Sequence, residues 1–258
     1  MACTENVASE AYADFITRYY IPSRDFLNGY PTDCIDFVNE QFAVVYLPLE
    51  PLLPLTLSTY TYSGIPKLYS LLDSTSMEAS GILTAARSPS LGNQGEGVII
   101  GFVDTGIDYE NPLFLNPDGT TRIEEIWDQT AGFGDGFEGT YFSPLYGTRY
   151  TRAQINEALS SDNPASVVPE ADTIGHGTFL ASIAAGNVSE DVDFTGAAPK
   201  AILAAVKLKP AKRYLRDFFL IREDAHAYQE NDIMMGVSYL VNLARRLGRP
   251  LVICLGIG

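Results

Sequence analysis

Two short motifs hold the residues whose chemistry stands out. Asp104 stands in Val-Asp-Thr-Gly-Ile-Asp at 103–108, directly after an apolar run, and His176 stands in Gly-His-Gly-Thr at 175–178. A carboxylate hydrogen-bonded to one imidazole nitrogen fixes the tautomer of the ring. It also stabilises the imidazolium that forms when the other nitrogen takes a proton from a nucleophile. Alone, an aspartate after a strand is a common turn former, but the two motifs together predict a general base and the group that orients it.

Two other segments resemble chemical sites but fit structural roles. The second histidine, His226, lies in the charged stretch Arg-Glu-Asp-Ala-His at 222–226 and is predicted to be a solvated surface residue. The segment 74–79, Ser-Thr-Ser-Met-Glu-Ala, has a serine but lacks a preceding glycine and carries Glu78. It is interpreted as the start of a helix with a capping box.

The elements that would position the two motifs follow a parallel α/β pattern. Continuous apolar runs at 98–103, 201–208 and 251–255 are typical of strands buried on both faces. Between the last two, apolar residues at helical spacing predict a helix over 233–247, capped by Asn231 or Asp232 and ended by Gly248. Strand, helix and strand in this order imply a right-handed parallel crossover, so the fold class is α/β with helices covering a parallel sheet.

The rest of the chain divides around a proline-rich stretch between residues 48 and 66, which is predicted to be an extended linker. Before it, strand-like runs at 13–20, 34–38 and 42–47 predict a small α+β unit over 1–61. After it, residues 62–258 form the predicted main domain. Within that domain, 115–172 is rich in Gly, Asp, Asn, Pro and Thr and is interpreted as a surface insertion with one helical stretch at 151–159.

The composition excludes several classes of protein. The net charge of −15 argues against nucleic-acid binding, which relies on clustered Lys and Arg. No run of about 18 apolar residues is present, which predicts no membrane span, and the polar N-terminus shows no secretory signal. Three cysteines without a Cys-x-x-Cys pair argue against a disulfide framework or a zinc site and favour a reducing compartment.

At this point the chain resembles a known family. Its aspartate and histidine motifs are similar to those of the subtilases, the subtilisin-like serine proteases. The segment Gly-Ala-Ala-Pro-Lys-Ala at 196–201 and the strand at 251–258 resemble the segments that follow in that family. The wide spacing of the two motifs and the segments 72–79 and 126–130 are most similar to the Csp-like germination subtilases of spore-forming bacteria.

The resemblance implies a role for each part. Asp104 would orient His176, His176 would act as general base, and Cys254, Leu255 and Gly256 would pair with an extended peptide or protein substrate. Residues 1–61 would be the prodomain, a partner of the catalytic domain, and self-cleavage would fall within 57–63. No cofactor or metal is expected from the residues, and calcium is suggested by family analogy alone.

The resemblance does not include the catalytic nucleophile of the family. The family order of aspartate, histidine and serine places the serine, in a Gly-Thr-Ser-Met-Ala segment, and the oxyanion-hole asparagine after Gly258. The 258 residues alone are therefore expected to be inactive. An inactive pseudoprotease or a truncated peptide-binding or regulatory module is the alternative. An aspartic protease, suggested by Asp-Thr-Gly at 104–106, is disfavoured because that class is all-β. A cytoplasmic or spore-associated location is expected.

Overall fold

The computed structural model describes the chain except for residues 1–2, 21–33, 70–93, 133–145 and 189–193. It contains two compact units. The first unit comprises residues 1–70, 130–148 and 209–239, and the second comprises 71–129, 149–208 and 240–258. The segment 74–79 lies outside the described residues, so its interpretation as a helix start stays a prediction.

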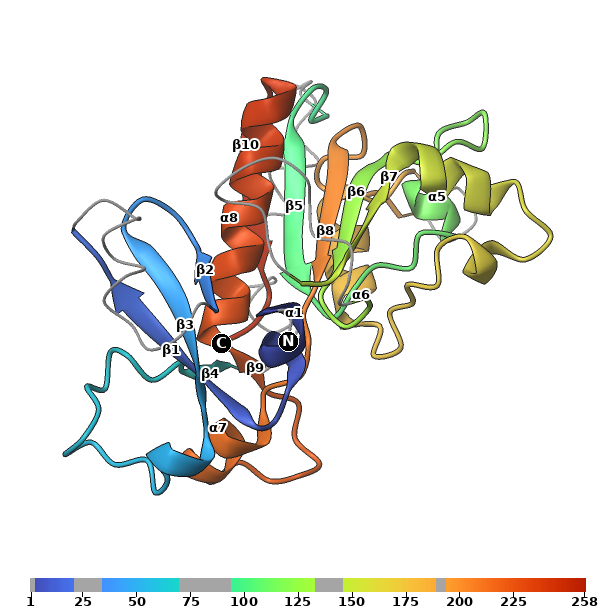
Figure 1. Cartoon of the computed structure of the whole chain (residues 1–258). Coiled ribbons are helices and arrows are strands. Elements are labelled where there is room, and N and C mark those ends of the chain that lie inside the picture. Colours follow the sequence, from blue (N-terminus) through green and yellow to red (C-terminus); the bar gives the residue numbers. More distant parts are fainter. Residues whose placement is uncertain (1–2, 21–33, 70–93, 133–145, 189–193) are drawn as a thin grey trace. The chain divides into compact units, whose positions relative to one another are not determined.

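The first unit is built on a three-stranded antiparallel sheet (Figure 1). Strands β1 (Tyr12–Arg18), β2 (Ile35–Phe37) and β3 (Phe42–Pro48) take the order β1-β3-β2, with β3 paired to both neighbours. The aromatic and β-branched content that favours strands in these segments also fills the interior of the unit. The three strand-like runs predicted from the sequence are therefore confirmed.

Segments far along the chain complete the first unit. They are α1 (Cys3–Ala8), the 3-10 turn η1 (Glu50–Leu52), the antiparallel pair β4 (Leu68–Tyr69) and β9 (Tyr228–Gln229), and α7 (Arg213–Phe218). Buried side chains of β1 pack with residues of α7 and with Ile65 in one apolar cluster, whose fully buried members include Ala13, Ile65 and Leu215. Residues 1–61 thus share a compact unit with residues 209–239.

The cysteines correct one prediction. Cys34 is disulfide-bonded, whereas Cys254 is free. The odd number of cysteines argued against a disulfide framework and favoured a reducing compartment. An odd count leaves one thiol over but does not prevent a single bridge, so that inference was wrong for Cys34.

The second unit contains a five-stranded sheet in the order β10-β5-β8-β6-β7 (Figure 1). Its strands are β5 (Ile99–Asp104), β6 (Ile123–Asp128), β7 (Thr148–Thr151), β8 (Ile202–Lys207) and β10 (Leu251–Leu255). The pairs β10–β5, β5–β8 and β8–β6 are parallel. The three strands predicted from continuous apolar runs are present within one or two residues, and the parallel α/β fold class is confirmed.

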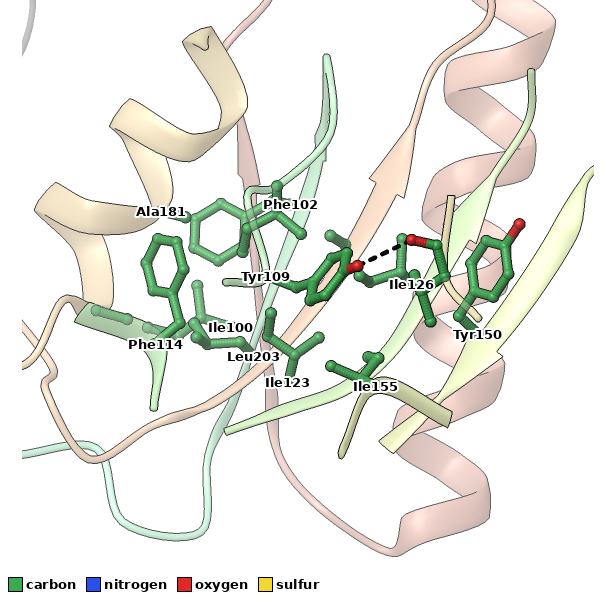
Figure 2. Close-up of a cluster of buried hydrophobic side chains, with 14 of the residues drawn as sticks. Ile100, Phe102, Tyr109, Phe114, Ile123, Ile126, Tyr150, Ile155, Ala181 and Leu203 are labelled. Carbon is green, nitrogen blue, oxygen red and sulfur yellow. Dashed lines mark hydrogen bonds between the residues drawn. The ribbon is translucent and has the colours of Figure 1, made fainter. Parts of the chain in front are cut away.

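Helices cover this sheet because β5 is apolar on both faces. Every residue of β5 is buried, and successive side chains point to opposite faces. Ile100 and Phe102 pack in a core cluster with Ala181 and Ala185 of helix α6 (His176–Ala185), as Figure 2 shows for the labelled residues. On the other face, Gly101 lies under Leu240 of helix α8 (Glu230–Leu247), whose side chain occupies the space that a Cβ would need.

The segment 115–172 corrects a second prediction. It follows the 3-10 turn η2 (Pro112–Phe114) and holds β6, β7, helix α5 (Arg152–Leu159) and the 3-10 turn η3 (Pro164–Ser166). The predicted helix at 151–159 is confirmed, but β6 is an internal strand of the sheet and not part of a surface insertion. The sequence Ile-Glu-Glu-Ile-Trp-Asp looks polar, yet Glu125 and Asp128 are buried. They pair with Arg246 and Lys207, respectively.

Helix α8 begins earlier than predicted and is not capped as predicted. Asn231 and Asp232 lie inside the first turn, where both are buried, and Asp232 pairs with Lys209. Its C-terminus matches the prediction, because Gly248 follows Leu247 with a φ of +61°, the left-handed conformation that glycine adopts at helix ends.

Candidate active site

Asp104 is placed at the carboxyl end of β5. In parallel α/β sheets this edge is where functional side chains gather. Its side chain is 1% exposed, and its Oδ1 accepts a hydrogen bond of 2.8 Å from the backbone N–H of Thr105. The apolar strand before it buries Asp104, and the turn after it supplies this donor.

His176 is the first residue of α6, a helix that packs against β5. Its Nδ1 lies 2.7 Å from Asp104 Oδ1, and its side chain is 15% exposed. Because an ionised carboxylate only accepts hydrogen bonds, this contact places the ring proton on Nδ1. Nε2 is then the basic nitrogen. The two residues singled out in the sequence are therefore brought together, as a buried carboxylate and a partly buried imidazole.

The electrostatics of the pair reflect two opposing effects. Burial raises the pKa of Asp104, because a carboxylate loses solvation away from water. The hydrogen bonds from His176 and from the Thr105 backbone lower that pKa but do not cancel the effect of burial. The pair thus keeps a weakly solvated carboxylate next to the imidazole, where its charge acts strongly on the ring.

Two glycines allow the chain to close around the pair. A Cβ on Gly177 would lie 2.2 Å from the carbonyl oxygen of Gly106 and 3.2 Å from Asp104 Cβ. A Cβ on Gly256 would lie 2.9 Å from Asp104 Oδ2 and 3.1 Å from His176 Cε1. Only glycine lets α6 and the end of β10 approach Asp104 this closely.

The three predicted substrate-binding residues have different surroundings. Gly256 is buried against the Asp104–His176 pair. Leu255 is exposed, while Cys254 is partly buried and packs against the apolar core of the second unit. Burial and the charge of Asp104 raise the pKa of the Cys254 thiol. The Cys254 side chain is therefore a core contact, and any role in substrate binding falls to the backbone.

A group of carboxylates beside the pair was not predicted from the sequence. Glu170 is 4% exposed and lies 3.8 Å from Lys207 Nζ, which is also 3.8 Å from Asp128. Burial raises the pKa of Glu170 to about 8, which the attraction of Lys207 reduces only in part. Asp172, four residues before His176, accepts hydrogen bonds from Thr105 and from the first turn of α6. The sequence carries one signal for Asp172. It is an acidic residue shortly before the glycine that precedes a helix, where a negative charge is favourable.

Metal ligands and membrane spans can be assessed over the described residues. No group of three or more His, Cys, Asp or Glu side chains in the described ranges is arranged to hold a metal ion, so calcium stays a prediction. Within those same ranges, no helix has the length and the apolar character needed to cross a bilayer. His226 is exposed, as predicted.

Comparison with known proteins agrees with this geometry. The model of the subtilase family matches residues 95–234, which include both Asp104 and His176. The subtilisin-like protease SBT3.6 of Arabidopsis thaliana is 27% identical over 163 residues, which cover 60% of this chain and 21% of that protein. SBT2.2 of the same organism is 39% identical over 100 residues, 36% of this chain and 11% of that protein. The chain therefore spans about a fifth or less of these relatives.

A solved structure agrees as well. The CspB protease of Clostridium perfringens has a TM-score of 0.53 and is 32% identical, and the match covers 69% of this chain and 32% of that protein. Its name, CspB, agrees with the Csp-like resemblance of the motif spacing and of the segments 72–79 and 126–130. The family match covers more than half of the residues. It agrees with the parallel sheet flanked by helices, with the aspartate at the end of β5 and with the histidine at the start of α6. The chain belongs to the subtilase family.

Proposed function

We propose that this chain is part of a serine endopeptidase of the subtilisin type, in which Asp104 orients His176 and His176 is the general base. The nucleophilic serine would be supplied by sequence outside these 258 residues. The observation that carries the proposal is the 2.7 Å contact between His176 Nδ1 and Asp104 Oδ1 at the carboxyl edge of the sheet.

The contact between His176 and Asp104 supports the following proton transfers in the proposed reaction. With its proton held on Nδ1 by Asp104, His176 takes the serine proton on Nε2 as the serine oxygen attacks the peptide carbonyl. Asp104 stabilises the imidazolium that results. His176 then donates that proton to the leaving amine as the C–N bond breaks, and the acyl-enzyme is hydrolysed when His176 activates a water molecule. Asp104 stays ionised throughout and takes no proton.

The substrate we propose is an extended peptide segment of a protein. Strand β10 forms one edge of the described sheet, and its last residues lead to Gly256 beside the reacting groups. A peptide could add to this edge through main-chain hydrogen bonds, which are indifferent to the side chains of the substrate. Residues 254–256 would then hold the peptide backbone.

Residues 1–61 would act as a prodomain that is cleaved within 57–63. In the structure this window is a series of exposed turns, which is the kind of backbone that proteases enter. N-terminal sequencing of the mature protein tests this assignment. A mature N-terminus between residues 58 and 64 is expected, and one after residue 80 would contradict the proposal.

Peptide hydrolysis by the complete gene product tests the catalytic assignment. Asp104→Asn is expected to lower kcat by about 10⁴-fold, because the imidazole loses its preferred tautomer. His176→Ala should lower kcat at least as much, whereas Asp162→Asn, an exposed aspartate away from the pair, should leave it unchanged. If the complete wild-type protein hydrolyses no peptide although it folds, the pseudoprotease alternative replaces this proposal.

A further inference from the structure

Asp172 is placed between the two motifs that carry the catalytic pair. Its Oδ1 accepts hydrogen bonds of 2.8 Å from the Thr105 hydroxyl and from the Gly175 N–H. Its Oδ2 accepts hydrogen bonds from Thr178, at 2.9 Å from the N–H and 2.7 Å from the hydroxyl. Four donors therefore fill both oxygens of this half-buried carboxylate.

The two threonines extend these contacts into a closed network. The Thr105 hydroxyl donates to Asp172 and accepts from the Gly177 N–H at 2.9 Å. The Thr178 hydroxyl donates to Asp172 and accepts from the Asp108 N–H at 2.9 Å. The network thus ties the loop after β5 to the first turn of α6. It does so through the residues next to Asp104 and on both sides of His176.

Asp172 also replaces a helix cap that α6 lacks. The residue at the N-cap position is Gly175, with a φ of +84° and no side chain to accept a hydrogen bond from the first turn. A negative charge at this end of a helix is favourable. Burial raises the pKa of Asp172, but the hydrogen bonds from Thr178 and Gly175 outweigh it and leave that pKa below its ordinary value. Asp172 is therefore ionised at neutral pH.

We infer that Asp172 is a positioning residue for the Asp104–His176 pair, which it holds at hydrogen-bonding distance through Thr105 and the first turn of α6. This inference rests on the proposed function. It differs from simple helix capping because Thr105, which shares Asp172 Oδ1 with Gly175, lies outside the helix and adjoins Asp104. Loss of the network should change the hydrogen bond of His176 as well as the stability of α6.

The chain offers a direct readout, because it contains only two histidines. NMR spectra of the 258-residue chain labelled with ¹⁵N on the imidazoles would report His176, with the exposed His226 as internal reference. In Asp172→Ala, we expect the Nδ1 proton of His176 to exchange with water about tenfold faster, because the hydrogen bond to Asp104 opens more often. The His226 signals should not change.

A matched control separates positioning from capping. Thr151 caps α5 with a full capping box and lies away from the pair. Thr151→Ala should lower the melting temperature as a lost cap does, yet leave the His176 exchange rate unchanged. Thr105→Val removes the bridge to the β5 loop and the acceptor of the Gly177 N–H, but it keeps the hydrogen bonds from Gly175 and Thr178 to Asp172. It should therefore accelerate exchange, with a loss of stability of the same order as that of Thr151→Ala. If Asp172→Ala does not fold, the exchange rate of the His176 proton in Thr105→Val tests the positioning role in its place.

The outcomes distinguish this inference from the proposed function. Faster His176 exchange in Asp172→Ala and Thr105→Val, but not in Thr151→Ala, supports positioning. Unchanged exchange in both variants, with Asp104→Asn still abolishing the slow Nδ1 proton, overturns positioning and leaves the pair intact. If Asp104→Asn has no effect on His176 either, the pair and the inference built on it both fail.

Discussion

The two units each bury a carboxylate next to a nitrogen base, and the two pairs are completed to different degrees. In the first unit, Asp14 pairs with Lys212, and in the second, Asp104 pairs with His176. Both carboxylates are nearly inaccessible to water. The difference lies in how many hydrogen bonds each carboxylate receives.

The Asp14–Lys212 pair is closed, in the sense that both carboxylate oxygens and the ammonium group have hydrogen-bond partners within the unit. Asp14 Oδ1 accepts from Lys212, and Oδ2 accepts from Gln229 at 3.0 Å and from Asn231 at 3.2 Å. Lys212 also donates to backbone carbonyls of the N-terminal segment, among them that of Tyr12 at 3.2 Å. A buried ion pair tolerates its loss of solvation only when such partners are present. This pair therefore has a structural role.

The Asp104–His176 pair is open by comparison. Asp104 Oδ1 accepts two hydrogen bonds, but Oδ2 has no hydrogen-bond partner in the part of the chain that the structure describes. The imidazole is also partly exposed, whereas Lys212 is not. A fold leaves buried polar atoms incompletely satisfied chiefly where function requires it. The comparison thus separates a pair whose hydrogen bonds are completed within the first unit from a pair that keeps one carboxylate oxygen unsatisfied among the described residues, which agrees with the catalytic role that we propose for it.

Of the expected changes in stability, the largest should come from breaking the closed Asp14–Lys212 pair. Asp14→Ala leaves the Lys212 ammonium buried without its counterion, which is expected to lower the free energy of unfolding by about 3–5 kcal/mol. Urea denaturation followed by circular dichroism measures this loss. Glu40→Ala, at an exposed carboxylate of the same unit, is the matched control and should have little effect.

The double variant Asp14→Leu/Lys212→Met sharpens the same point. Apolar replacement of both partners removes the unpaired charge, so it should cost much less than the single substitution. If Asp14→Ala costs less than about 1 kcal/mol, the pair is not structural and the contrast between the units is lost.

Substitution of Glu170 should have the next largest effect on stability, and the size of this effect depends on pH. Its pKa is raised from 4.5 to about 8 in the folded chain. Between these values the folded state keeps a proton that the unfolded state has lost, so the stability contribution falls as pH rises and is lost above about 8. Glu170→Gln stays neutral and should be more stable than the wild type at pH 9. The gain can reach a few kcal/mol, because a tenfold change in a protonation constant corresponds to about 1.4 kcal/mol.

Thermal melts between pH 5 and pH 9 test this expectation. The two melting curves should converge near pH 5, where the wild-type Glu170 is largely protonated, and diverge toward pH 9. Glu96→Gln, at an exposed surface pair, provides the control. A constant difference between wild type and Glu170→Gln over the whole range is the result that rules out this effect.

Gly177→Ala should have a smaller effect on stability but a specific one on the open pair. Alanine is favoured over glycine inside a helix, but its Cβ would meet the Gly106 carbonyl oxygen at 2.2 Å. We expect a loss of about 1–3 kcal/mol from overpacking and a weaker hydrogen bond between His176 and Asp104. Gly119→Ala, at a left-handed position with open space around it, should lose stability without any change in the His176 spectrum.

Much of the second unit could be predicted because its signals are local. Continuous apolar runs marked β5, β8 and β10, and helical spacing with a terminal glycine marked α8. The motifs around Asp104 and His176 predicted that the two side chains meet. In these segments the residues that decide the structure are neighbours in the sequence.

The wrong predictions fall where distant residues decide the structure. The Gly, Asp, Asn, Pro and Thr content of 115–172 indicates a surface insertion, whereas Glu125 and Asp128 of β6 are buried in the sheet. Their partners Arg246 and Lys207 come much later in the chain. The role of Asp172 could not be predicted because it depends on Thr105, which only the fold brings next to it. Composition alone could not foresee the disulfide at Cys34.

The tautomer of His176 tests the central claim most directly. Two-bond ¹H–¹⁵N correlation spectra of the neutral imidazole show which ring nitrogen carries the proton. We predict that Nδ1 is protonated and Nε2 is not, and that Asp104→Asn removes this preference while the exposed His226 stays unchanged. A neutral His176 with its proton on Nε2 in the wild-type chain would contradict the assignment of Asp104 as its orienter.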